Sequence, residues 1–140
     1  MAARFSADSW PKDRWPSFSF KEIACRETGD CVIDEELMDA LQKIRNSVGP
    51  LVITSAYRDP KHSIEAAKIE KTGLGGAHTL GKAVDIQCRG AKAVEILELA
   101  LKHGFTGIGV SQKGDSRFLH LDTIVAEDNF HVPRPHIWSY

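Results

Sequence analysis

The sequence has no excess of charge of either sign, few cysteines and no long apolar run. Its 18 Lys and Arg residues almost balance its 19 Asp and Glu residues, so the formal net charge is -1. A chain this close to neutrality lacks the broad positive field that draws proteins to nucleic acids or anionic membranes. We therefore expect neither a nucleic acid nor a membrane as a partner.

Cysteine occurs three times, and this odd number excludes a complete disulfide framework. Cys25 and Cys31 flank a turn-like segment, and their spacing is compatible with two free thiols, with one disulfide, or with a role in holding a metal. Cys88 follows an apolar strand, and we interpret it as a small buried hydrophobic residue.

The N-terminal twenty residues contain charged side chains and two Trp-Pro steps, but no apolar run long enough for a signal peptide or a membrane span. We expect synthesis in the cytoplasm, so any action outside the cell needs a separate route of release. The Trp-Pro steps predict an irregular strap over residues 1–16, with Trp10 and Trp15 packed on the remainder of the chain.

Length and composition predict a single domain over residues 17–140. A chain of 140 residues with 42% hydrophobic residues can bury a sizeable core. No internal repeat or low-complexity segment divides it. We expect the protein to be a monomer.

Helical periodicity is clearest after Asp34. Apolar residues recur at spacings of four, three and four between Leu37 and Val48. Asp34 is the predicted N-cap of this helix, and Gly49 marks its end. A shorter helix is predicted over residues 62–70.

A second amphipathic helix is predicted over residues 91–103. Its inner stripe is expected to comprise Val94, Leu97 and Leu101, which lie on one side of a helix. Gly104 is its predicted stop.

Short β-branched and alternating runs predict the strands. Residues 51–55 are typical of a buried strand, and residues 82–88 alternate so that Asp85 lies on the polar face. Residues 106–110 and 117–124 are separated by a turn and predict a hairpin.

The last of these strands has two distinct faces. Leu119 and Leu121 take the core face, so Phe118, His120 and Asp122 share the opposite one. Together the elements predict an α+β fold with a mainly antiparallel sheet, helices packed on one side and a groove on the other.

Two histidines and an aspartate predict a zinc site in this groove. Imidazole and carboxylate groups are the ligands of open catalytic zinc sites, in which three protein groups leave one position for water. His78 precedes the strand residue Asp85 by seven positions, and Gly81 between them allows the chain to turn back. His120 meets Asp85 if their two strands are neighbours.

Four segments carry a resemblance to a known group of enzymes. They are Ser55–Arg58, Gly76–Ile86, Gly107–Gly109 and Phe118–Asp122. Together they resemble the D-Ala-D-Ala carboxypeptidase group of zinc peptidases, which shares a fold with the hedgehog signalling domain. The nearest branch is similar to short phage endolysins and murein endopeptidases, and the segments at 18–25 and 134–138 resemble the ends of that branch.

The resemblance implies a fold, a cofactor and a substrate. It implies a hedgehog and DD-peptidase-like fold with Zn²⁺ held by His78, Asp85 and His120. It implies that Arg58 meets a substrate carboxylate or carbonyl, although Arg58 alone also fits an ion pair with Asp59 or Glu65. The implied reaction is hydrolysis of a peptide bond in the stem peptide of bacterial peptidoglycan.

The implied biology is that of a phage or prophage endolysin, or of a wall-remodelling D,D-carboxypeptidase or endopeptidase. Such a protein acts on the cell wall after holin-type release. The alternative is a catalytically silent module in which zinc is structural and the groove only binds wall peptide or a protein partner, as hedgehog domains illustrate.

The sequence does not identify the general base. Two positions depart from the group's pattern: Gly76 replaces a usual Ser, and Arg117 stands where some relatives carry an acidic residue. Asp122 shares a strand face with the third zinc ligand, and it fits either the role of base or that of a partner that orients the ligand ring. Asp115 is a weaker candidate, and His136 is a candidate for stabilising the developing oxyanion.

Overall fold

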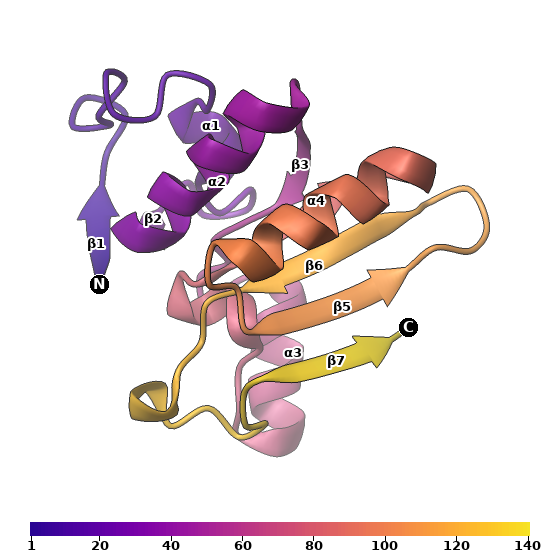
Figure 1. Cartoon of the computed structure of the whole chain (residues 1–140). Helices are drawn as coiled ribbons and strands as arrows, with labels where there is room; N and C mark the ends of the chain where they lie inside the picture. The colour runs from indigo at the N-terminus through magenta and orange to yellow at the C-terminus, as the bar shows by residue number, and fades with distance from the viewer.

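A five-stranded sheet forms the centre of the computed structural model, which describes all 140 residues (Figure 1). Its strands run in the order β3, β4, β6, β5, β7, and β1 and β2 form a separate sheet. The strands are β1 (Ala2–Phe5), β2 (Cys31–Asp34), β3 (Val52–Ser55), β4 (Ala83–Gln87), β5 (Gly107–Ser111), β6 (Phe118–Asp122) and β7 (His136–Ser139). The helices are α1 (Phe20–Ile23), α2 (Glu35–Val48), α3 (Ser63–Thr72) and α4 (Gly90–Lys102), with two 3₁₀ turns, η1 (Ala77–Leu80) and η2 (Ala126–Asp128).

Neighbouring strands of the large sheet are antiparallel except β5 and β7, which are parallel. β5 and β6 form the predicted hairpin. β4 pairs with β6 in a register that sets Asp85 opposite His120. The predicted α+β class with a mainly antiparallel sheet is therefore confirmed.

The core lies between one face of this sheet and two helices. Helix α4 crosses that face over β6, and α2 packs against α4 (Figure 1). The alternation along β4 and β6 sends Ile86, Leu119 and Leu121 into this core, where they are almost fully buried. Helix α3 is the exception to the predicted one-sided arrangement, because it lies on the other side of the sheet, where its Lys68 borders a groove (Figure 1).

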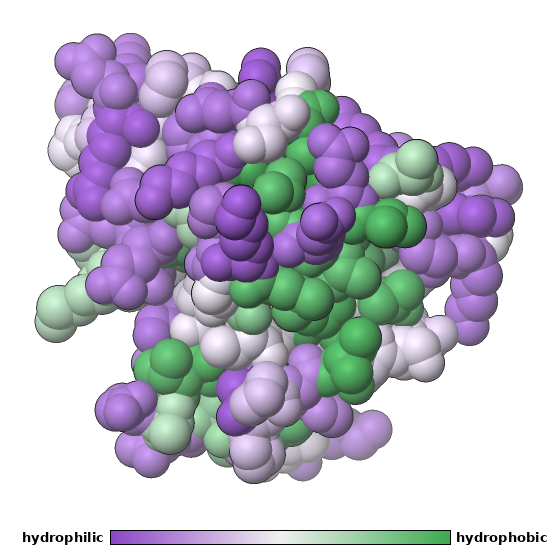
Figure 2. All heavy atoms as spheres, viewed as in Figure 1, coloured by the Kyte–Doolittle hydropathy of each residue, from purple (hydrophilic) through white to green (hydrophobic).

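Helix α4 turns a different face to the core from the one its periodicity predicts. Ile96 and Ala100 are fully buried, whereas Val94 and Leu101 are 66% and 59% exposed, and Leu97 is half-buried. Figure 2 shows hydrophobic residues gathered over the middle of this face of the molecule, where α4 lies. The predicted inner stripe is wrong because α4 carries apolar residues on more than one side, so that tertiary packing selected the face.

Two expectations about strands are also corrected. β3 is an edge strand with Val52 and Thr54 exposed, so it is not a fully buried strand. The strap over residues 1–16 is not wholly irregular, because Ala2–Phe5 pair with β2 as the strand β1.

The tryptophans of the N-terminal segment pack into the main core, as predicted. Trp10 and Trp15 are 5% and 0% exposed. Arg14 donates two hydrogen bonds to the Asp39 carboxylate on α2, at 2.9 and 2.7 Å, and the Trp15 indole N–H donates a third at 2.9 Å. Asp39 thus holds the N-terminal segment against α2.

Replacing this carboxylate is expected to loosen that attachment. Asp39→Ala should lower the free energy of unfolding by about 1–2 kcal/mol, because the indole N–H of the buried Trp15 loses its acceptor and a partly exposed ion pair is lost. The measurement is urea unfolding at pH 7, with Glu98→Ala, an exposed carboxylate of α4, as the control. A loss no larger than that of the control would contradict the prediction.

The same carboxylate predicts a pH dependence. The hydrogen bond from Arg14 lowers the pKa of Asp39 below its ordinary value. Its ion-pair contribution is therefore complete above the unfolded pKa of about 4 and is lost as the pH falls through the lower folded value. The stability difference between wild type and Asp39→Ala should shrink below about pH 4.

All three cysteines are buried and free. Of the alternatives for Cys25 and Cys31, the structure therefore has two free thiols, and neither belongs to a metal-ligand cluster. The interpretation of Cys88 as a small buried residue is confirmed. None of the helices combines the length and the apolar run that a membrane span requires.

Candidate metal centre

Strand pairing and one turn bring the three predicted ligands together. Asp85 of β4 and His120 of β6 are cross-strand partners on the face opposite the core. His78 lies in η1, and Gly81 ends that turn with a positive φ of 70°, after which the chain enters β4. The turn therefore returns His78 to the strand that carries Asp85.

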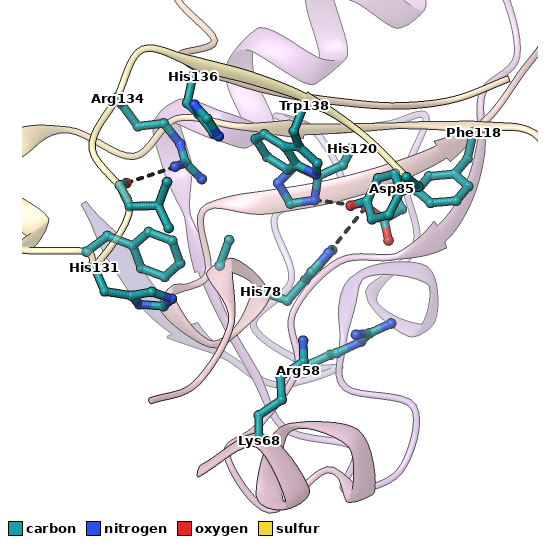
Figure 3. A pocket seen from close by; sticks show the side chains of 14 residues that line it. Arg58, Lys68, His78, Asp85, Phe118, His120, His131, Arg134, His136 and Trp138 are labelled. Atoms are coloured by element: carbon teal, nitrogen blue, oxygen red, sulfur yellow. Dashed lines mark hydrogen bonds and ion pairs between the residues drawn. The ribbon is translucent and has the colours of Figure 1, made fainter. Parts of the chain in front are cut away.

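The donor atoms of these residues form a cluster that is compact enough for one ion. His78 Nε2 and His120 Nδ1 lie 3.3 and 3.1 Å from the same Asp85 oxygen, Oδ1. All three donors lie within 4.8 Å of one another, and Figure 3 shows their side chains converging. Donors at 2.0–2.2 Å from a tetrahedral zinc ion stand about 3.4 Å apart, so these spacings fit zinc.

The remaining ring nitrogens of both histidines are held by acceptors. His78 Nδ1 lies 2.6 Å from the Ala56 carbonyl oxygen, which can only accept, so Nδ1 is the donor and Nε2 is the ring nitrogen directed to the cluster. His120 Nε2 lies 2.7 Å from Asp122 Oδ2, which leaves His120 Nδ1 toward Asp85. Fixing the outer nitrogen in this way orients an imidazole for a metal.

Asp122 is itself clamped. It is fully buried, and Arg134 donates to both of its oxygens, from Nε at 2.9 Å and from Nη2 at 2.7 Å. Gly107 on the neighbouring strand lies against this carboxylate, since a Cβ at Gly107 would collide with it. Burial raises the pKa of Asp122, but the bonds from Arg134 and His120 outweigh burial and lower it, so Asp122 is ionised.

The two carboxylates also shape the charge of the centre. Burial raises the pKa of Asp85, but the adjacent His120 and His78 rings outweigh it and hold the pKa well below its usual range. Burial lowers the pKa of His120, but Asp122 and Asp85 outweigh burial and raise it. Negative charge thus surrounds two imidazoles, and such a setting favours a bound cation.

A sequence profile of the family described as Peptidase M15 matches residues 16–122, about three quarters of the chain. The chain belongs to the peptidase M15 family. The predicted relationship to the D-Ala-D-Ala carboxypeptidase and hedgehog-type group is thereby confirmed. M15 peptidases are zinc-dependent, and His78, Asp85 and His120 lie within the matched residues. Comparisons with curated proteins and with solved structures give no match.

In this M15 family member the cluster opens into a groove with a volume of about 490 Å³. Strand β7 forms one wall, where Trp138 lies over Gly109 so closely that a Cβ there would stand 2.8 Å from the indole. The groove is lined by Arg58, Lys68, Ala77, His78, Asp85, Phe118, His120, Phe130, His131, Val132, Arg134, His136, Trp138 and Tyr140.

The other predicted site residues divide between the groove and its surroundings. Arg58 and His136 line the groove, and His136 stacks on Trp138 with ring centroids 5.4 Å apart. Asp115 does not line it. Arg117 does not either, and its side chain donates to the Gly114 carbonyl oxygen in the hairpin turn.

Arg58 forms an ion pair with a residue of α3. Its Nη1 lies 3.3 Å from Glu65 Oε2, so the pairing with Glu65 that its sequence context allowed is present. Its Nε–H is buried without an acceptor in the protein. The side chain lines the groove and is 21% exposed, so the outer N–H groups of the guanidinium can donate to a molecule bound there.

The sequence does not predict the roles of Arg134 and Glu65. It places Arg134 only in the closing segment, and it gives Glu65 only as one alternative partner of Arg58. Both contacts join segments far apart in the chain or bury a charge, and no local pattern identifies either. The available signals are that Arg134 lies two positions before His136 in the sequence and that Glu65 is an alternative ion-pair partner of Arg58.

Proposed function

We propose that this chain is a zinc metallopeptidase that hydrolyses peptide bonds in bacterial peptidoglycan. His78, Asp85 and His120 would hold the ion. The observation that carries the proposal is the convergence of three donor atoms within 4.8 Å at a groove, with the outer nitrogens of both imidazoles already bound to acceptors. The stem peptide of the wall is the proposed substrate, as an endolysin or a wall-remodelling carboxypeptidase or endopeptidase requires.

The chemistry divides between the ion and the protein. A zinc ion in such a site supplies a Lewis acid and a water molecule acidic enough to act as a nucleophile near neutral pH. Arg58, which lines the groove with a partly exposed guanidinium, binds a carboxylate or carbonyl oxygen of the peptide. Trp138 walls the groove and limits the access of bulk water to the centre.

We assign Asp122 the role of orienting His120 rather than that of general base. Both of its oxygens are occupied by Arg134 and His120, and it has no exposed surface from which to reach a substrate. Asp122 does not line the groove, and Asp85, a proposed ligand, is the only carboxylate among the groove-lining residues. His131 and His136 are the groove-lining histidines outside the ligand set, and imidazole is the commonest general acid or base in enzymes.

Digestion of purified cell wall tests this function. Zinc-loaded protein should release new amino termini from peptidoglycan, and treatment with a chelator should abolish the release by more than about tenfold. Mass spectrometry of the products then identifies the bond that is cut. Release that persists without metal, or no release from several wall chemotypes, would overturn the proposal.

Asp122→Asn separates the peptidase from a catalytically silent module. The variant keeps an oxygen for one donor but loses the charge that Arg134 and His120 share. We expect zinc to be retained with an affinity about 10–100-fold weaker and turnover to fall further. A wild-type protein that binds zinc and wall peptide but has no turnover to lose would instead be the silent module.

A further inference from the structure

Glu65 is the most buried charged group beside the groove that the reaction itself leaves unexplained. It lies on α3 and is fully buried, yet it belongs to neither the ligand set nor the groove lining. Isolated carboxylates are not tolerated inside proteins unless donors compensate for the lost water. The groups that compensate Glu65 therefore indicate what it does.

Its three donors all belong to the site. Oε1 accepts the backbone N–H of Gly76 at 2.8 Å, and Oε2 lies 3.3 Å from Arg58 Nη1 and 3.4 Å from Lys68 Nζ. Gly76 begins the turn η1 that carries His78. One carboxylate thus connects the metal-ligand turn with the two cations on the same side of the groove, below His78 in Figure 3.

Gly76 is matched to this carboxylate in space. A Cβ at position 76 would lie 3.0 Å from Glu65 Oε1 and 3.1 Å from Lys68 Nζ, so a side chain there would have to displace the carboxylate and the ammonium by a few tenths of an ångström. The Gly76 backbone N–H donates to the same Oε1 at 2.8 Å. A glycine at this position therefore lets the chain approach the carboxylate closely.

A second contact ties Arg58 to the same turn. The Arg58 backbone N–H donates to the His78 carbonyl oxygen at 3.2 Å, next to the bond between His78 Nδ1 and the Ala56 carbonyl oxygen. Movement of the turn would therefore move both the proposed zinc ligand His78 and the backbone of Arg58. The Glu65 side chain has no exposed surface, whereas those of its partners Arg58 and Lys68 are partly exposed. Glu65 therefore restrains the turn and Arg58 from the interior of the protein.

We propose that Glu65 is a positioning residue that holds Arg58 for the substrate and fixes the His78 turn for the metal, with Gly76 as its space-matched partner. The part of this inference that concerns substrate binding, its substrate arm, rests on the proposed function. The part that concerns zinc binding, its metal arm, rests only on the geometry of the turn. Arginine has large rotamer freedom, so an Arg58 released from Glu65 must be ordered again when substrate binds.

Four variants, compared with wild type, separate the effect on zinc binding from the effect on substrate binding. Glu65→Gln keeps an oxygen for the Gly76 N–H and removes the charge, so the zinc dissociation constant should stay within about threefold of wild type. Glu65→Ala removes both contacts and should weaken zinc binding about tenfold, as loss of a supporting contact does. Gly76→Ser should weaken zinc binding similarly in wild type but much less in the Glu65→Ala background, where space is available. Competition with a chromogenic chelator measures the zinc dissociation constant of wild type and of all four variants.

The substrate arm uses an analogue that cannot be cut. A phosphinate analogue of D-Ala-D-Ala with a free carboxylate should bind zinc-loaded Glu65→Gln at least tenfold more weakly than wild type, and the carboxamide form of the analogue should show no such difference. Tighter binding of the carboxylate form by Glu65→Gln would overturn the proposal, because it would show that Glu65 only offsets the charge of Arg58. Additive effects of Gly76→Ser and Glu65→Ala on zinc affinity would overturn the metal arm.

Failure here is distinguishable from failure of the proposed function. Zinc affinity and analogue binding are measured without turnover. A wild-type protein that cuts no wall peptide removes the peptidase assignment, whereas the coupling between Glu65 and Gly76 is still decided by the zinc measurement. Conversely, an active enzyme with an unaltered Glu65→Gln variant loses only the role of Glu65.

Discussion

His120→Ala is expected to weaken zinc binding by more than about 100-fold and to remove peptidase activity. The substitution deletes one of three proposed ligands, and loss of a ligand costs more than the 10–100-fold typical of a supporting residue. It also leaves Asp122 with Arg134 as its only side-chain partner. Metal analysis after gel filtration and chelator competition measure the first effect, and wall digestion measures the second.

The same variant should lose the stabilisation that zinc gives the wild type. A ligand that binds only the folded state adds RT ln(1 + [L]/Kd), about 2.7 kcal/mol at a concentration 100 times Kd. Thermal unfolding with and without zinc should therefore show a large shift for wild type and little shift for His120→Ala. His103→Ala, at the end of α4 and outside the cluster, is the control. Full zinc occupancy in His120→Ala would remove His120 from the ligand set.

Arg134→Met is expected to give the largest loss of stability among the variants considered. Arg134 is 4% exposed at its side chain and makes two hydrogen bonds to the fully buried Asp122. Removing one partner of a buried ion pair typically costs about 3–5 kcal/mol, and here it leaves the Asp122 carboxylate with His120 as its one side-chain partner. Urea unfolding of the metal-free protein should show this loss. Zinc affinity should also fall, about 10–100-fold, because His120 loses its fixed orientation.

Arg117→Met provides a matched control. Arg117 is a surface arginine whose side chain bonds only to a carbonyl oxygen of the hairpin turn, so its loss should change stability by less than about 1 kcal/mol. If both arginine variants lose the same stability, the clamp on Asp122 is not what holds this part of the fold. If Arg134→Met binds zinc as wild type does, Asp122 does not depend on Arg134 to orient His120.

These two predictions concern opposite ends of one chain of contacts, in which Arg134 holds Asp122 and Asp122 orients His120. The chain joins the C-terminal segment to β6, and the family profile ends at residue 122, before that segment begins. The matched residues therefore contain the proposed ligands but not the arginine that supports one of them. Truncation studies of this protein should keep β7 and the segment before it.

Local sequence patterns predicted the strands that carry the ligands. Alternation along 82–88 and 117–124 put Asp85 and His120 on polar faces, and the structure has them there because one face of each strand must bury its apolar side chains. Gly81 predicted the turn that returns His78. These inferences succeeded because each depends on neighbours a few residues away.

Local patterns did not predict the structure where the same residues could be packed in more than one way. Helix α4 has apolar side chains on more than one side, and only its position over the sheet decided that Ile96, rather than Val94, is buried. The β-branched run at 52–55 predicted a strand but not its place at the edge of the sheet. The role of Asp122 was undecided for the same reason, since strand periodicity gives a face but not a partner.

By itself the sequence determined which residue types can bind a metal, which faces of the strands they occupy and the α+β class, because these follow from chemistry and local periodicity. Only the tertiary structure decided that Arg134 closes on Asp122 and that Glu65 fills the space beside Gly76. Both contacts bury a charge between segments that are distant along the chain or separated by a loop, and the free energy of such a contact depends on burial and on distances in three dimensions.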